Sequence, residues 1–278
     1  MFAVLQIRPP EKGLMKRSWR CLRPAKPLAV QVAVKGGAPF LCVTVSKKHG
    51  RIPWEEIAFY AGRCAGRMLL PNGLLPPVDC PVKAFHPTVL AALALFNTAC
   101  AVLAQRHAPP EMERITLLDP TGALARRAHR LLPFASLVRI VTQKPAAYQQ
   151  AAERAMEDYG AALLVQETGI GAGDSTVVIA PYGLNGDFVP AARCAVFLGA
   201  GHVCEAGGIT IRAEGFDLPE PYQRLLPEGI DADRFACALY EECGLRALGE
   251  RTYTSLQLYG AMTTTGGAAK MLGALHKQ

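Results

Sequence analysis

Three short stretches of the sequence place polar, charged or glycine residues directly after apolar runs. Asp119-Pro120-Thr121-Gly122 follows "ITLL", Thr142-Gln143-Lys144 follows "LVRIV", and Gly199 to His202 follows "CAVFL". Carboxylates accept hydrogen bonds from sugar hydroxyls or hold metals, lysines attract anions, and glycines let backbone amides approach a phosphate. The chemistry that these residue types predict is the binding of a nucleotide or another polar small molecule.

The turn at residues 119–122 resembles a dinucleotide-binding fingerprint only in its position between a strand and a helix. The G-x-G-x-x-G pattern supplies three glycines, for the turn, for the approach of the pyrophosphate and for helix packing, and only Gly122 is present here. A phosphate about 4 Å from Asp119 would also be repelled by roughly 4 kcal/mol in a protein-like dielectric. We therefore predict that this turn does not bind pyrophosphate and that Asp119 or Thr121 caps the next helix.

The end of the second strand indicates which dinucleotide this chain would bind. An acidic residue there accepts the ribose hydroxyls of NAD, whereas this chain has Thr142, Gln143 and Lys144. The sequence therefore favours NADP. In the alternative interpretation, Lys144 is a solvated residue ahead of a helix that Pro145 starts.

The loop after "CAVFL" is a second candidate for phosphate binding. Gly199 and Gly201 match the first two fingerprint glycines, Cys204 replaces the third, and His202 lies at the predicted strand end. The complete set of predicted cofactor-binding residues is Asp119, Thr121, Gly122, Thr142, Lys144, Gly199, Gly201 and His202.

The string Asp119-Pro120-Thr121-Gly122-Ala123-Leu124 also resembles the phosphorylated-aspartate loop of the haloacid dehalogenase superfamily. Thr142 ends the next strand as the second motif of that family would. The resemblance covers only residues 119–142 and implies metal-dependent phosphoryl transfer, with Asp174 as a further acidic metal ligand. That family usually places a small β-flap after the first motif, whereas this segment has room for one helix. We accordingly expect no metal.

Two arginine pairs lie four residues apart in predicted helices, Arg63 with Arg67 and Arg126 with Arg130. Like charges on one helix face cost about 0.2–0.5 kcal/mol unless a negative group offsets them. We therefore predict a substrate or anion site at Arg63 and Arg67. Pairing with surface acids is the alternative.

The apolar pattern predicts the scaffold that would position these residues. It gives strands at 115–119, 137–142, 161–166, 175–180 and 194–198, helices at 121–132 and 145–159 between the first of them, and C-terminal helices at 231–246 and 254–275. Nearly all-apolar strands separated by amphipathic helices are typical of a parallel sheet that is covered on both faces. The predicted fold class is α/β, with a Rossmann-like doubly wound parallel sheet in residues 111–278.

Residues 1–110 are predicted to form a smaller, basic α+β lobe. Alternating apolar residues around Lys35-Gly36-Gly37 predict a β-hairpin. A helix at 54–70 follows, and the proline-rich residues 71–81 are interpreted as a linker or a lid. Residues 84–105 contain no Asp, Glu, Lys or Arg and are long enough to span a membrane. Their Pro, Asn and Thr residues favour a buried helix, so we expect no membrane partner.

The charge of the chain is concentrated near its start. The net charge is +7, and residues 1–53 carry eleven Lys and Arg against one acid, Glu11. Such asymmetry is compatible with nucleic acid, an acidic partner or an anionic substrate, but nucleic acid is not favoured because no aromatic residues are interleaved as in an RNA-binding sheet. The nine cysteines show no metal-type pairing and no leader is evident, which predicts a cytoplasmic protein with reduced thiols.

Two functional hypotheses follow from the sequence. The first is a small-molecule or nucleotide-binding α/β protein, in its most specific form an NADP-dependent oxidoreductase with a degenerate dinucleotide fingerprint. The second is a non-catalytic binding or regulatory protein whose basic N-terminal lobe contacts nucleic acid or an acidic partner.

Overall fold

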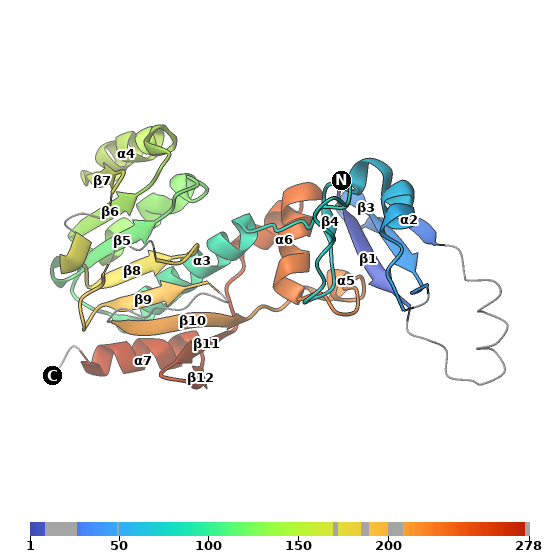
Figure 1. Ribbon diagram of the computed structural model, residues 1–278. Helices are drawn as coiled ribbons and strands as arrows, with labels where there is room; N and C mark the ends of the chain where they lie inside the picture. Colours follow the sequence, from blue (N-terminus) through green and yellow to red (C-terminus); the bar gives the residue numbers. More distant parts are fainter. Residues whose placement is uncertain (9–26, 49, 169–171, 185–188, 200–207, 276–278) are drawn as a thin grey trace. The chain divides into compact units, whose positions relative to one another are not determined.

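The computed structural model describes residues 1–278 apart from 9–26, 49, 169–171, 185–188, 200–207 and 276–278 (Figure 1). The chain divides into two compact units. The first consists of Met1–Leu90 and Leu218–Leu248, and the second of Ala91–Asp217 and Gly249–Gln278. This division differs from the predicted boundary near residue 110, because the chain returns to the first unit after residue 217.

Aromatic packing explains why residues 218–248 belong to the first unit. Helix α6 (Ala232–Glu242) carries Phe235, whose ring lies 5.5 Å from that of Phe40 and 6.5 Å from that of Phe2. The amide of Ala38 also donates to the carbonyl of Cys243, at 2.9 Å. Such contacts link residues far apart in the sequence, so they leave no local signal.

The first unit contains a four-stranded sheet in the order β2-β3-β1-β4. The strands are β1 (Ala3–Ile7), β2 (Leu28–Val34), β3 (Gly37–Val45) and β4 (Met68–Leu69). Strands β2 and β3 are antiparallel, which confirms the predicted hairpin, and β1 lies parallel to both β3 and β4.

The predicted helix at 54–70 is wrong in its second half. Helix α2 (Trp54–Ala61) ends because Gly62 adopts a φ of +53°, which a helix interior does not allow. A short 3₁₀ turn (Gly62–Cys64) follows, and the chain then enters β4.

The second unit contains an eight-stranded sheet in the order β12-β11-β10-β9-β8-β5-β6-β7. The strands are β5 (Arg114–Leu118), β6 (Leu137–Val141), β7 (Leu163–Gln166), β8 (Val177–Ala180), β9 (Ala195–Leu198), β10 (Ile209–Gly215), β11 (Ser255–Leu258) and β12 (Ala261–Thr263). The six from β5 to β10 pair in parallel, and β11 and β12 add antiparallel pairs.

Counted from β5, the parallel strands have the spatial order 3-2-1-4-5-6, which is that of a Rossmann fold. The predicted fold class is therefore confirmed, including the parallel pairing of the first strand with its neighbour β6. The strands are apolar because both faces of the sheet are covered: Leu117, Val178, Ile179, Val196 and Phe197 are all fully buried.

The remaining segments are mostly helical. The helices are α3 (Val89–Arg106), α4 (Pro145–Tyr159), α5 (Glu220–Gln223) and α7 (Thr265–Leu275), and the longer 3₁₀ segments are η3 (Ala125–Phe134) and η5 (Arg246–Glu250). Figure 1 shows α4 beside β7 and α7 beside β11 and β12. Helix α4 has the predicted bounds. The predicted helix at 121–132 is a 3₁₀ segment instead, and residues 255–263 form a hairpin because Tyr259 and Gly260 both have positive φ.

Helix α3 is, within the described residues, the one helix long and apolar enough to cross a membrane, and 72% of it is buried. Its polar side chains have partners in the second unit. Asn97 Nδ2 donates to the carbonyls of Gly249 and Arg251, both at 2.9 Å, and Thr98 Oγ1 accepts from the amide of Tyr253 at 2.8 Å. These contacts are those of a core helix.

Candidate site at the carboxyl edge of the sheet

The carboxyl ends of the parallel strands bring several of the predicted site residues to one edge. Asp119 follows β5, Thr142 follows β6, and the buried Gly199 follows β9. Gly201 and His202 lie outside the described residues. The turn after β5 also lies against the start of α4, because a Cβ added to Gly122 would be 3.0 Å from Ala147 Cβ and 3.3 Å from Lys144 Cβ.

The Asp119 carboxylate closes the turn that follows β5. It is fully buried. Its Oδ1 accepts from the Thr121 amide at 3.2 Å, the Thr121 hydroxyl at 2.8 Å and the Gly122 amide at 3.1 Å. Its Oδ2 accepts from the Leu124 amide at 2.8 Å and the Tyr148 hydroxyl at 2.7 Å. The amides that a phosphate would need at this turn therefore already have an acceptor.

This arrangement matches the prediction only in part: the Asp119 carboxylate accepts backbone amides of the turn, but it does not cap a helix, because the N-cap of η3 is Leu124 and forms no side-chain cap hydrogen bond. Thr121 contributes as well, since its Oγ1 accepts from the Ala123 amide at 3.3 Å. The 3₁₀ segment η3 begins directly after this turn, at Ala125.

Two tyrosines complete this network. Tyr148 comes from α4 and is fully buried, and Tyr182, which follows β8, lies with its hydroxyl 3.1 Å from Thr121 Oγ1. Burial and the neighbouring Asp119 carboxylate raise the pKa of Tyr148, so the phenol stays protonated and donates to Asp119. Neither tyrosine is a residue that the sequence predicts at this site. Tyr148 shares the apolar helix face of Ala151 and Ala155, a pattern that indicates only core packing.

The end of β6 has a different character. The hydroxyl of the buried Thr142 accepts from the Lys144 amide at 3.0 Å. Lys144 precedes α4, is exposed, and makes no ion pair with a described residue. Arg126 of η3 is likewise exposed and forms none. This corner of the edge therefore presents positive charge without a carboxylate partner.

The arginine pairs do not form the predicted helix faces. Arg63 lies in a 3₁₀ turn and Arg67 just before β4, where Arg67 pairs with Glu242 and lies over the Phe85 ring at 5.4 Å. The structure therefore does not bring Arg63 and Arg67 together on one helix.

The second arginine pair fails for a related reason. A 3₁₀ segment has three residues per turn, so residues three apart align in η3, and Arg126 and Arg130 do not. Arg127 and Arg130 instead both donate to Asn97 Oδ1, at 3.2 and 2.9 Å, and Arg127 also pairs with Glu250 at 2.6 Å.

The position of Asp174 argues against the phosphotransfer interpretation. Asp174 precedes β8 and so lies at the amino edge of the sheet, opposite Asp119. It pairs with Arg114 at 2.6 Å and Arg139 at 3.1 Å. No three His, Cys, Asp or Glu side chains within the described residues are placed to hold a metal ion. The two acids that this interpretation requires are therefore not neighbours.

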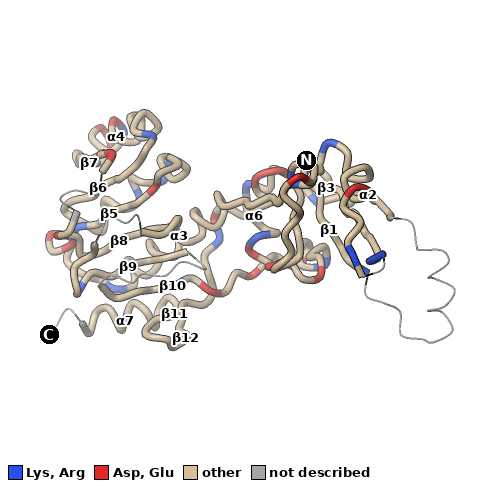
Figure 2. Tube along the Cα trace, viewed as in Figure 1, with Lys and Arg blue, Asp and Glu red and all other residues tan. Residues whose placement is uncertain are grey.

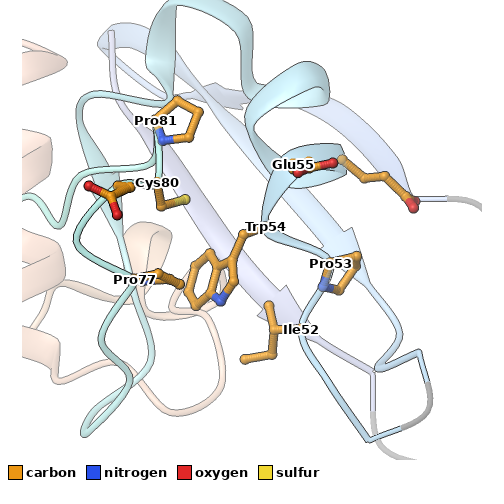
Figure 3. A pocket seen from close by; sticks show the side chains of 9 residues that line it. Ile52, Pro53, Trp54, Glu55, Pro77, Cys80 and Pro81 are labelled. Carbon is orange, nitrogen blue, oxygen red and sulfur yellow. The ribbon is translucent and has the colours of Figure 1, made fainter.

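The first unit contains a cavity of about 500 Å³ that the sequence does not predict. It is lined by Ile52, Pro53, Trp54, Glu55, Glu56, Pro77, Asp79, Cys80 and Pro81. Figure 3 shows the Trp54 indole at the centre, with Pro77 and Cys80 on one side and Ile52 and Pro53 on the other. Residues 77–81 thus form a cavity wall within a segment that had been interpreted as a linker or a lid.

The hypothesis of a basic N-terminal partner surface depends mainly on residues that are not described. Six of the eleven cations in residues 1–53 lie in 9–26. Figure 2 shows that Lys and Arg are interspersed with Asp and Glu along the described chain of both units. Of the described cations in residues 1–53, Lys48 is paired with Glu56. The basic partner surface therefore stays a prediction.

Comparisons with known proteins do not assign this chain to a family. No protein-family model matches the sequence, and no curated protein matches it. Among solved structures, an L-tryptophan dehydrogenase from Nostoc punctiforme is similar at 13% identity, covering 99% of this chain and 87% of its own, with a TM-score of 0.30. A quinate dehydrogenase from Corynebacterium glutamicum in complex with NAD is similar at 12% identity, covering 90% and 97%, with a TM-score of 0.29. The Rossmann assignment rests on the strand order of this chain.

Proposed function

We propose that this chain is a small-molecule-binding protein whose second unit binds a phosphate-bearing nucleotide beside Lys144, without a pyrophosphate on the turn after β5. The contrast between two neighbouring groups carries the proposal. The Asp119 carboxylate already accepts hydrogen bonds from the amides of the turn. Lys144, which lies next to Gly122, has no carboxylate partner among the described residues. An anion at this edge is thus repelled from one position and attracted to the other.

The nucleotide that fits best is NADP, which makes an NADP-dependent oxidoreductase the most specific form of the proposal. In Rossmann folds the residue at the end of the second strand meets the ribose, and a cation there accommodates a 2′-phosphate. Here that position holds Thr142, Gln143 and Lys144 and no acid. Arg126, exposed on η3, is a second cation close in sequence to the turn.

Two isomeric nucleotides provide the sharpest test. Adenosine 2′,5′-bisphosphate and adenosine 5′-diphosphate carry the same two phosphates in different positions. We expect thermal stabilisation by the 2′,5′-isomer and by NADP, and weaker stabilisation by the 5′-diphosphate and NAD. A ligand at about 100 times its dissociation constant adds roughly 2.7 kcal/mol. Equal responses to the two isomers, or none to either, would overturn the proposal.

A pair of lysine variants assigns the response to the site. Lys144→Ala should abolish the preference for the 2′,5′-isomer. Lys270→Ala, which removes an exposed lysine of α7, should retain it. Loss of the preference in both variants would indicate non-specific attraction to a basic protein.

A further inference from the structure

We infer that the cavity around Trp54 in the first unit is a binding site for an organic cation, an ammonium or guanidinium group attached to an apolar body. The inference concerns a separate place in the chain and does not depend on the function proposed for the second unit. It rests on the walls of the cavity, its charge and its size.

The apolar walls are held in place by the core of the first unit. Ile52 and Trp54 pack against a buried cluster that includes Ile57 and Cys80. The opposite wall begins with a turn in which the Cys80 amide donates to the Pro77 carbonyl at 3.1 Å. The Cys80 sulfur then accepts from the Val82 amide at 3.4 Å. Prolines at 53, 77 and 81 further fix the backbone on both sides. These contacts hold both walls in place, and the Trp54 indole lies between them (Figure 3).

The charged groups of the cavity are all acidic. Glu55, Glu56 and Asp79 line it, and Lys48 pairs with Glu56 from outside the lining. Glu55 and Asp79 form no ion pair with a described residue. Two carboxylates thus have no cationic partner in the described part of a chain whose net charge is +7. An anionic ligand is disfavoured here, and a cationic one is attracted.

Trp54 makes this attraction specific for cations with an apolar body. The face of an indole is the best aromatic partner for an ammonium or guanidinium group. Prolines and Ile52 offer a surface for hydrocarbon at the same place. The cavity volume of about 500 Å³ lies within the range of small-molecule sites, roughly 300–1,000 Å³, and exceeds what a simple ion needs.

Tryptophan fluorescence tests the inference with two probes of nearly equal shape. The chain has two tryptophans, so Trp19→Phe leaves Trp54 as the single tryptophan. Benzylammonium should change its emission saturably, with an affinity at least about fivefold higher than that of benzyl alcohol, the neutral analogue, as one desolvated cation–π contact predicts. Equal affinities for the two probes, or no saturable change with benzylammonium, would overturn the inference.

Matched variants separate a binding role from a structural one. Glu55→Gln with Asp79→Asn should weaken benzylammonium binding by roughly three- to tenfold and leave benzyl alcohol unaffected, because only the charge changes. Glu157→Gln, an exposed acid of α4, is the control and should change neither. Unaltered benzylammonium affinity in the double variant, with an unchanged melting temperature, would show that the carboxylates do not recognise the cation.

Discussion

The turn after β5 and the Trp54 cavity both combine carboxylates with aromatic side chains, but these groups bond to one another at the turn and line an open space at the cavity. At the turn, a buried carboxylate accepts hydrogen bonds from three amides and two hydroxyls of its own chain. At the cavity, three carboxylates and an indole line an open space. The turn stands where a Rossmann fold holds its ligand, yet its polar groups are satisfied internally. Position in a fold therefore identifies a site only when the groups there are free to bind.

The largest effect that this comparison predicts is that of removing the Asp119 carboxylate. Asp119→Ala leaves the Thr121 and Leu124 amides and the Tyr148 phenol without their acceptor, while the Gly122 amide keeps the backbone carbonyl of residue 119 at 3.3 Å. We expect a loss of about 3–5 kcal/mol in the free energy of unfolding, measured with urea. Asp158→Ala, an exposed acid of α4, should stay within about 0.5 kcal/mol of the parent. An Asp119→Ala protein as stable as the parent would mean that the carboxylate is kept for a ligand.

A pair of glycine variants tests the close packing of the turn. Gly122 and Gly160 have φ values of +75° and +60°, but only Gly122 has neighbours where a Cβ would lie. Gly160→Ala should cost about 1–2 kcal/mol from backbone strain alone. Gly122→Ala should cost about 2–4 kcal/mol because Ala147 and Lys144 must also move. Thermal unfolding measures both, and equal losses would argue against close contact between the turn and α4.

The Tyr148 hydroxyl should contribute less, and its contribution should depend on pH. Tyr148→Phe removes a hydrogen bond to a carboxylate, which should cost about 1.5–3 kcal/mol at neutral pH. Burial and then Asp119 raise the folded pKa of Tyr148 above its ordinary value of 10.0. A group with a raised folded pKa stabilises below its unfolded pKa and loses that contribution as pH rises. The difference between parent and variant should therefore narrow above pH 10, and a difference that widens there would contradict this account.

The smallest effect is expected at Asp174, a carboxylate at the opposite edge that is exposed and paired. Burial alone would raise its pKa, but hydrogen bonds from Arg139 and Arg114 outweigh it and lower the pKa below 3.8. Its contribution is thus present above pH 4 and is lost as pH falls further. Asp174→Asn should cost less than about 1 kcal/mol at neutral pH, as surface ion pairs do. If Asp174→Asn lowered the free energy of unfolding as much as Asp119→Ala does, the buried carboxylate at one edge and the exposed one at the other would not differ in their contribution to stability.

The parallel sheet could be predicted well because each of its strands is marked by a short apolar run in the sequence. Apolar runs of four to five residues became β5, β6, β8 and β9, and Pro145 with the apolar period that follows it gave the bounds of α4. The division into units could not be predicted, because it depends on Phe235 packing against Phe2 and Phe40 from the far end of the chain. The helix predicted over 254–275 is wrong only in its first half, where positive φ values at Tyr259 and Gly260 set a turn, whereas α7 confirms its second half.

The candidate site was predicted only in part for the same reason. The charge of Asp119 and the missing glycines predicted that its side chain accepts backbone amides, as it does, but the predicted helix cap is wrong because η3 has no side-chain cap. The buried donor Tyr148 comes from 29 residues away, so no spacing rule places it beside Asp119. The Trp54 cavity likewise requires two segments, 52–56 and 77–81, whose meeting depends on the core of the first unit.

Nuclear magnetic resonance of the backbone amides tests most directly the central claim that the turn after β5 is closed to pyrophosphate. NADP would be titrated into ¹⁵N-labelled protein while the amides of Gly122, Leu124 and Lys144 are followed. We predict that Lys144 shifts saturably and that Gly122 and Leu124, which donate to Asp119, shift little. Saturable shifts of Gly122 and Leu124 with NADP or with pyrophosphate alone would contradict the account.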